Sequence, residues 1–118
     1  MRKIFTAIVI TFTSLFSPAA FFEDQRFSPE VSALINDYMD HYCLYYHETN
    51  AKLQKAVFVR QDVDVKADST SSYIDFTLTY DYGSGPFDLY QMIEIVERQG
   101  QYSIGSTFGA CRGYVPYN

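Results

Sequence analysis

Basic residues are scarce in this chain, and no apolar run is long enough to cross a membrane. Nine Lys and Arg stand against fourteen Asp and Glu among 118 residues. Nucleic acids and anionic membrane surfaces bind through clustered cationic side chains, so neither is expected as a partner. The longest apolar stretch, residues 4–16, falls short of the roughly 20 residues that a spanning helix needs. A basic protein partner is compatible with this charge.

Catalytic and cofactor-binding signatures are missing as well. The chain has no Gly-x-Ser-x-Gly, His-Glu-x-x-His or Cys-x-x-Cys motif, no phosphate loop and no dinucleotide fingerprint. Asp37 and His41 lie four residues apart, a spacing that suits metal binding or acid–base chemistry on one helix face. An ordinary solvated pair explains the same spacing, and zinc needs three or four ligands. We therefore expect no metal and no cofactor, and we favour a non-enzymatic protein.

The first twenty residues have the three parts of an export signal. Arg2 and Lys3 form a positive start, residues 4–16 an apolar core, and residues 17–20 supply small side chains for cleavage. A retained membrane anchor is the rival interpretation, and the short apolar core argues against it. Residues 1–20 are thus predicted to be a signal peptide. Residues 21–118 are predicted to be one small domain, located in the periplasm or secreted.

Two cysteines, Cys43 and Cys111, are the only ones in the chain. Exported proteins keep disulfides, and an even number of cysteines fits one bridge, so a disulfide is predicted between them. Two buried free thiols are the alternative. The mature part has no Trp but holds all eleven Tyr of the chain. Tyr is common at protein contact surfaces because its ring is apolar and its hydroxyl is polar.

One amphipathic helix is predicted near the start of the domain. Ser28-Pro29-Glu30 combines a capping hydroxyl, a proline at the first helical position and an acidic residue at the positive helix end. The helix is indicated by apolar residues at spacings of three and four: Val31, Leu34, Ile35, Tyr38, Tyr42, Tyr45 and Tyr46. It is expected to end near residues 48–50. Residues 21–27 are expected to form a short leader.

Four strands are predicted after the helix, because the apolar period changes to two. They are expected at residues 57–67, 73–82, 87–97 and 102–108. Short turns join antiparallel neighbours, and one helix covers only one sheet face. The predicted fold is therefore α+β, with one N-terminal helix packed on a four-stranded antiparallel meander. This layout resembles the cystatin roll by analogy. The protease-binding Gln-x-Val-x-Gly motif is missing, since residues 61–65 lack the glycine, so no activity is carried over.

A strand register follows from bringing the apolar alternations to one side. The register pairs Ala67 with Ser72 across the first turn and Tyr82 with Phe87 across the second. It places the apolar residues of three strands on the side that the helix covers.

The same register would align three carboxylates on the opposite side. Asp64 would lie opposite Asp75, and Asp75 opposite Glu94, with Tyr73 and Tyr90 flanking this acidic row. Like charges directly opposite each other destabilise a sheet and raise each other's pKa. A cation or a basic partner would explain such a row. A solvated acidic sheet face is the alternative.

These features favour a small exported binding protein, such as an inhibitor or an immunity-like partner, that acts on another protein through an aromatic and acidic surface. One alternative is a small periplasmic enzyme with a pocket between helix and sheet, using Asp37 and His41 or the acidic row. Another alternative is a subunit of a secreted or envelope assembly.

The exported protein is expected to lack residues 1 to about 20, because cleavage after Ala19 or Ala20 removes the apolar core. Cleavage after Ala19 places Ser17 and Ala19 at the two positions that must be small. The mature chain then keeps seven basic and fourteen acidic side chains, a net charge of −7. Intact-mass measurement of the exported protein checks this, and a species that begins at Met1 would refute the export prediction.

Overall fold

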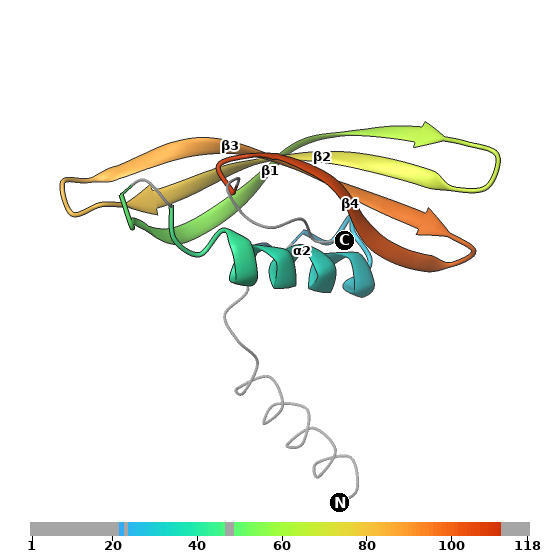
Figure 1. Ribbon diagram of the computed structural model, residues 1–118, viewed down its shortest axis with the longest axis horizontal. Coiled ribbons are helices and arrows are strands. Elements are labelled where there is room, and N and C mark those ends of the chain that lie inside the picture. The colour runs from blue at the N-terminus through green and yellow to red at the C-terminus, as the bar shows by residue number, and fades with distance from the viewer. Residues whose placement is uncertain (1–21, 23, 47–48, 112–118) are drawn as a thin grey trace, which may run out of the picture.

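One helix and four antiparallel strands make up the part of the chain that the computed structural model describes, residues 22, 24–46 and 49–111. They are α2 (Pro29–Tyr42), β1 (Lys52–Val65), β2 (Thr70–Asp81), β3 (Pro86–Arg98) and β4 (Gln101–Gly109). The strands lie in the order β1-β2-β3-β4, and the helix runs beneath the middle of the sheet (Figure 1). We call the covered side of the sheet its inner face and the opposite side its outer face. The predicted α+β fold is confirmed. The predicted signal peptide lies outside the described residues.

The helix begins where it was predicted but ends earlier. The Ser28 hydroxyl accepts a hydrogen bond from the backbone N–H of Val31 at 3.2 Å, as expected of a cap. The helix stops at Tyr42, so the predicted end near residues 48–50 is wrong. Tyr46 instead donates its N–H to the Ala51 carbonyl, because Asn50 adopts a positive φ that turns the chain back into β1. Tyr46 fits the helical spacing of apolar residues in the sequence although it lies beyond the helix. It is apolar because it packs on the sheet, beside Tyr80.

The segment before the helix belongs to the core, so the prediction of a mere leader is wrong. Phe22 is buried and meets Phe76 edge to face, with ring centroids 5.0 Å apart. Asn36 on α2 holds it in place, accepting from the Phe22 N–H and donating to its carbonyl. Phe27 lies over Phe58 of β1. This segment therefore extends the cover that the helix gives to the inner face.

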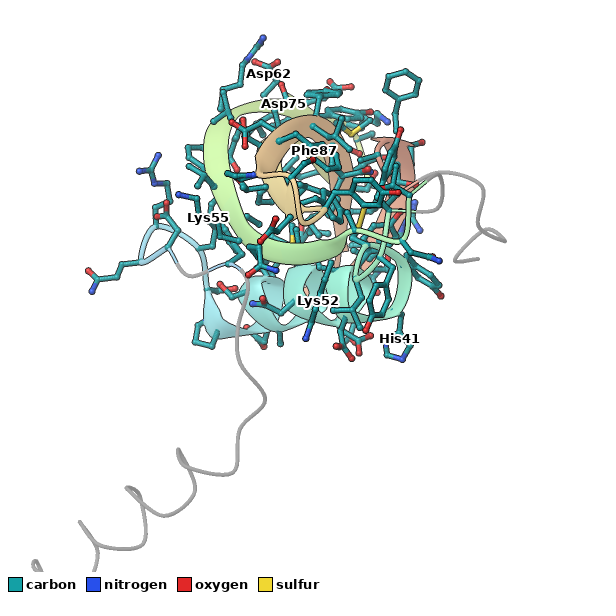
Figure 2. All side chains as sticks on the ribbon, turned by 90° about the vertical axis from the view of Figure 1, so that its left-hand side faces the viewer. His41, Lys52, Lys55, Asp62, Asp75 and Phe87 are labelled. Atoms are coloured by element: carbon teal, nitrogen blue, oxygen red, sulfur yellow. A yellow bond between two sulfur atoms is a disulfide. The ribbon has the colours of Figure 1, made fainter. Side chains whose placement is uncertain are left out.

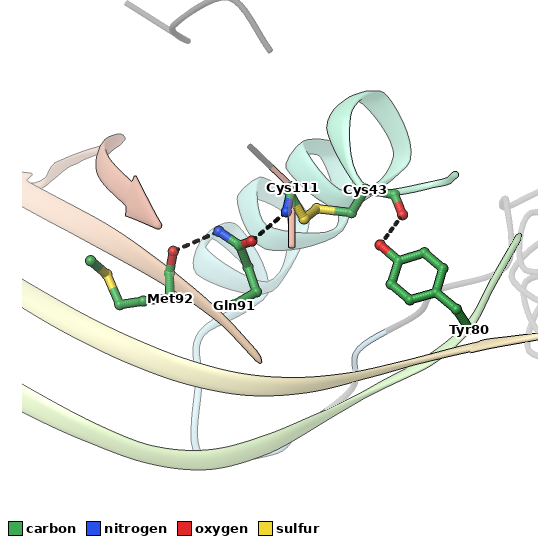
Figure 3. The surroundings of a disulfide bond; sticks show 5 residues. All are labelled: Cys43, Tyr80, Gln91, Met92 and Cys111. Atoms are coloured by element: carbon green, nitrogen blue, oxygen red, sulfur yellow. Dashed lines mark hydrogen bonds between the residues drawn. A yellow bond between two sulfur atoms is a disulfide. The ribbon is translucent and has the colours of Figure 1, made fainter. Parts of the chain in front are cut away.

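A disulfide between Cys43 and Cys111 joins the end of the helix to the end of β4, which confirms the predicted bridge (Figure 3). The Tyr80 hydroxyl donates to the Cys43 carbonyl from the neighbouring sheet. The Gln91 side chain accepts from the Cys111 N–H at 2.7 Å and donates to the Met92 carbonyl at 2.9 Å. The bridge closes a loop of 68 residues, which corresponds to about 4 kcal/mol in the chain-entropy model.

The two predicted hairpin registers are wrong. Val65 pairs with Thr70, so the first four-residue turn lies two residues earlier than the predicted pairing of Ala67 with Ser72. Across the next turn Tyr80, rather than Tyr82, pairs with Phe87. Near these two turns, the observed pairing differs from the predicted pairing by an even number of residues. The side chains of β2 and β3 therefore keep their predicted faces. In the pairing of β3 with β4, Val96 lies opposite Ser103.

A bulge in β1 changes the faces of its residues. The pairing shifts between Phe58 and Arg60, so that Val59 is the extra residue. Phe58 points to the inner face and Val57 to the outer face. A uniform alternation counted from Val63 would place each of these two residues on the other face. The far end of β1 extends past the helix, and Val63 and Val65 stay exposed there.

Gly109 allows the chain to turn back over β3 towards the disulfide. Its φ is +133°, and a Cβ there would lie 2.3 Å from the Tyr90 carbonyl oxygen and 2.7 Å from the Gln91 Cα. Gly85 has nearly the same φ, +132°, but a Cβ there would meet nothing within 4 Å.

Gly109→Ala is therefore expected to destabilise the protein more than Gly85→Ala. Both substitutions strain the backbone, at a cost of about 1–3 kcal/mol. Only Gly109→Ala also forces two backbone segments apart, and this adds about 2 kcal/mol. Urea unfolding of the two variants measures the difference. Equal losses of stability would show that the close approach of Gly109 to β3 does not matter.

Candidate protein-binding face

The outer face of the sheet carries the five residues that were predicted to bind a partner protein: Asp64, Tyr73, Asp75, Tyr90 and Glu94. Paired residues across the strands form its rows. From the tip of the first hairpin inwards, the rows are Asp64–Ser71–Val96–Ser103, Asp62–Tyr73–Glu94, Arg60–Asp75–Met92–Phe108, Val57–Thr77–Tyr90 and Lys55–Thr79–Asp88. The face opposite the helix is therefore mixed in character, with aromatic, aliphatic and charged side chains side by side.

The predicted acidic row does not form. Asp64 pairs with Ser71, Asp75 pairs with Arg60 and Met92, and Glu94 pairs with Tyr73. The observed registers differ from the predicted ones by an even number of residues. The three carboxylates therefore lie on the predicted face but in different rows. The prediction that they oppose one another is wrong. No group of three or more potential metal ligands occurs among the described residues.

Asp75 instead lies at the centre of a polar cluster. The Tyr90 hydroxyl donates to Asp75 Oδ1 at 2.8 Å, and the Arg60 Nε lies 3.9 Å from Asp75 Oδ2. Arg60 also donates to Asp62 at 2.6 Å. Partial burial, and then the hydrogen bond to Asp75, raise the pKa of the Tyr90 hydroxyl, so Tyr90 stays protonated and fixed as a donor. Figure 2 shows Asp62 and Asp75 on the side of the sheet away from the helix.

Tyr90 and Phe108 form an exposed aromatic pair beside this cluster. Their ring centroids are 6.3 Å apart, and the two residues are 48% and 67% exposed. Met92 lies in the same row as Phe108, partly exposed. Phe108 could not be predicted from the sequence as part of this face, because a uniform alternation from Ile104 places it on the inner face. A register shift in the pairing of β3 with β4 reverses it.

Glu94 is the buried carboxylate of the outer face, 7% exposed. The Ser106 N–H donates to its Oε1 at 2.8 Å, and a Cβ at Gly105 would lie 2.5 Å from the same oxygen. Burial opposes its ionisation, but hydrogen bonds from Ser71 and Ser106, with the charge of Lys66, outweigh burial and lower the pKa of Glu94. This is opposite to the raised pKa that the acidic row required. Glu94 therefore ties β3 to its neighbours and is poorly placed to meet a ligand.

An open hollow of about 640 Å³ adjoins the aromatic pair towards the second turn. It is lined by Lys55, Val57, Thr77, Thr79, Pro86, Phe87 and Asp88. Thr79 donates its hydroxyl to Asp88 at 2.8 Å, so the hollow has a fixed polar wall. An apolar side chain such as Val57 next to polar groups is the usual composition of a contact surface.

Asp37 and His41 form a local pair on the exposed side of the helix. The His41 Nδ1 lies 2.8 Å from the Asp37 carbonyl oxygen and 3.3 Å from its carboxylate. The backbone hydrogen bond and the charge of Asp37 raise the pKa of His41. Between helix and sheet, by contrast, Ile35, Met39 and Phe76 are fully buried and fill the space.

Comparisons with protein-family models, with curated proteins and with solved structures found no match to this chain. The likeness to a cystatin roll thus stays a prediction. No described helix is long and apolar enough to cross a membrane.

Glu94→Gln is expected to lower stability at neutral pH by about 1–2 kcal/mol, because it weakens hydrogen bonds to a buried charge. The folded pKa of Glu94 lies below its ordinary value of 4.5. Its contribution is therefore fully present above pH 4.5 and is lost as the pH falls through the folded pKa.

Urea unfolding at about pH 6 and about pH 3 measures both effects. Glu94→Gln should lose less stability between the two pH values than the wild type does. Asp64→Asn, an exposed carboxylate of the same face, is the control and should behave like the wild type. An equal pH dependence of Glu94→Gln and the wild type would refute this role of Glu94.

Proposed function

We propose that this chain is an exported, non-enzymatic binding protein of the inhibitor or immunity-like kind, which holds another protein on its outer face. The observation that carries the proposal is the exposed pair of Tyr90 and Phe108. Aromatic side chains in the middle of a contact provide much of the binding energy in protein complexes. The disulfide supports export, since such bonds persist outside the cytosol.

The pair is held in place before any partner binds. Tyr90 lies on β3, a central strand, and its hydroxyl is bonded to Asp75. The chain after Gly109 returns to β3 through a hydrogen bond from the Ala110 N–H to the Tyr90 carbonyl at 2.9 Å. A surface that is already ordered loses little conformational entropy on binding, which favours a tight complex.

The charge of the surroundings favours a basic partner. Asp62, Asp75 and Asp88 surround the aromatic pair and the hollow, and the mature chain carries a net charge of −7 in total. Complementary charge speeds the encounter and selects the partner, while the apolar groups contribute most to affinity. A protein surface with Lys or Arg around one or two apolar side chains fits this arrangement.

The double variant Tyr90→Ala/Phe108→Ala is expected to weaken the complex at least about tenfold, because it removes the aromatic centre of the contact. Affinity capture from the envelope and culture fluid of the source cells, with the mature protein as bait, identifies the partner. Calorimetry with the purified partner then gives the dissociation constants.

Tyr82→Ala is the matched control, since Tyr82 is also exposed, at 55%, but lies in the second turn. It should bind as the wild type does. Failure of the wild type to retain any stoichiometric protein, or equal affinity of the double variant, would contradict the proposed function.

A further inference from the structure

We propose that two copies of this chain join antiparallel along β1, about a two-fold axis at Gln61, so that their sheets form one eight-stranded sheet. The join lies at the β1 edge, whereas Phe108 lies on β4 at the opposite edge. The inference concerns self-association of the chain and does not require the partner of the proposed function, although Asp62 belongs to both surfaces.

The free edge of β1 is open for pairing over most of its length. In the described part of the chain, residues near Tyr45 pair with this edge only at its start, through the bridge of Tyr45 with Lys52 and the hydrogen bond of the Leu53 N–H to Leu44. From residue 54 onwards no described residue pairs with this edge of β1. A long open edge is a template for another strand.

Exposed valines line this edge strand. Val63 and Val65 are 54% and 75% exposed, and Val57 and Val59 are about half exposed. Natural edge strands are usually kept apart by charges, prolines or short length. Valine is instead favoured where a strand is paired and partly covered. Four such residues on one edge strand indicate that the strand has a partner.

The sequence of β1 is symmetric about Gln61. Arg60 and Asp62 flank it, and Val59 and Val63 follow on either side. When two copies pair antiparallel about Gln61, Arg60 of each lies opposite Asp62 of the other. Opposite charges across strands stabilise the pairing. Centring the axis on Arg60 or on Asp62 would set like charges against each other, so the charges select the register at Gln61.

The bulge in β1 fits this register. Val59 is the extra residue, so Phe58 and Val59 together lie opposite Val63 of the second copy. Phe58 and Val63 both point to the inner face. Val63, which the helix does not reach, would thereby gain an apolar neighbour. Arg60 and Asp62 are now bonded within one chain at 2.6 Å, and both side chains are mostly exposed, so they can exchange partners.

Sedimentation velocity of the mature protein over a concentration series tests the dimer. The wild type should dimerise. Arg60→Asp places carboxylates opposite one another, and Asp62→Arg places cations opposite one another. Each variant alone should raise the dimer dissociation constant at least about tenfold. A mixture of the two should form heterodimers, and the double swap Arg60→Asp/Asp62→Arg should restore the homodimer. Arg98→Asp, at the end of β3, is the control and should not change the dimer.

A cysteine at position 61 tests the register directly. Residues directly opposite across strands have Cβ atoms about 4.5–5.5 Å apart, so Gln61→Cys should form a disulfide between two copies on mild oxidation. Asp64 lies away from the two-fold axis, so the cysteines of two Asp64→Cys copies are not opposite each other. This variant should not form the disulfide. A wild type that stays monomeric at every concentration would overturn the proposal. So would a dimer that both single charge reversals leave unchanged, or covalent dimers of the two cysteine variants in equal yield.

Discussion

The helix is much shorter than the strands on which it packs, and this mismatch governs the rest of the structure. Fourteen residues of α2 span about 21 Å, whereas fourteen residues of β1 span about 46 Å. The helix therefore covers only the middle of the inner face. The fully buried apolar side chains of β2, such as Ile74, Phe76 and Leu78, lie in this middle part. Towards the first and third turns the strands extend past the helix.

A short helix also needs attachment at both ends, and the chain provides it. At one end Asn36 binds Phe22, which brings the preceding segment into the core. At the other end the disulfide, the Tyr80 hydroxyl and the Gln91 side chain hold Cys43 and Cys111 against the sheet. The outer face has no second layer in the described residues. Its aromatic pair and its polar cluster are thus open to a partner, and the uncovered end of β1 is open to a second copy.

The sequence predicted the elements and the layers well, because each depends on local patterns. Ser28-Pro29 marked the helix start, and the alternation from Tyr73 to Tyr82 marked β2 and its faces. The registers were predicted wrongly because they depend on the positions of turns and bulges, which apolar alternation alone does not determine. The first turn lies two residues earlier than predicted, which moved Asp64 away from Asp75. The register shifts placed Phe58 and Phe108 on faces that a uniform alternation does not indicate. Phe22 was missed because one apolar residue in a polar segment has no period.

Hydrogen exchange of the oxidised mature protein, followed residue by residue at a concentration too low for association, tests the central claim most directly. If the helix organises only the middle of the sheet, amides of α2 and of residues 74–80 and 89–95 should exchange only through global unfolding. Amides of residues 62–71 and 97–104 should exchange through local opening, at a free energy several kcal/mol smaller. Uniform protection along the full length of the strands would contradict this account.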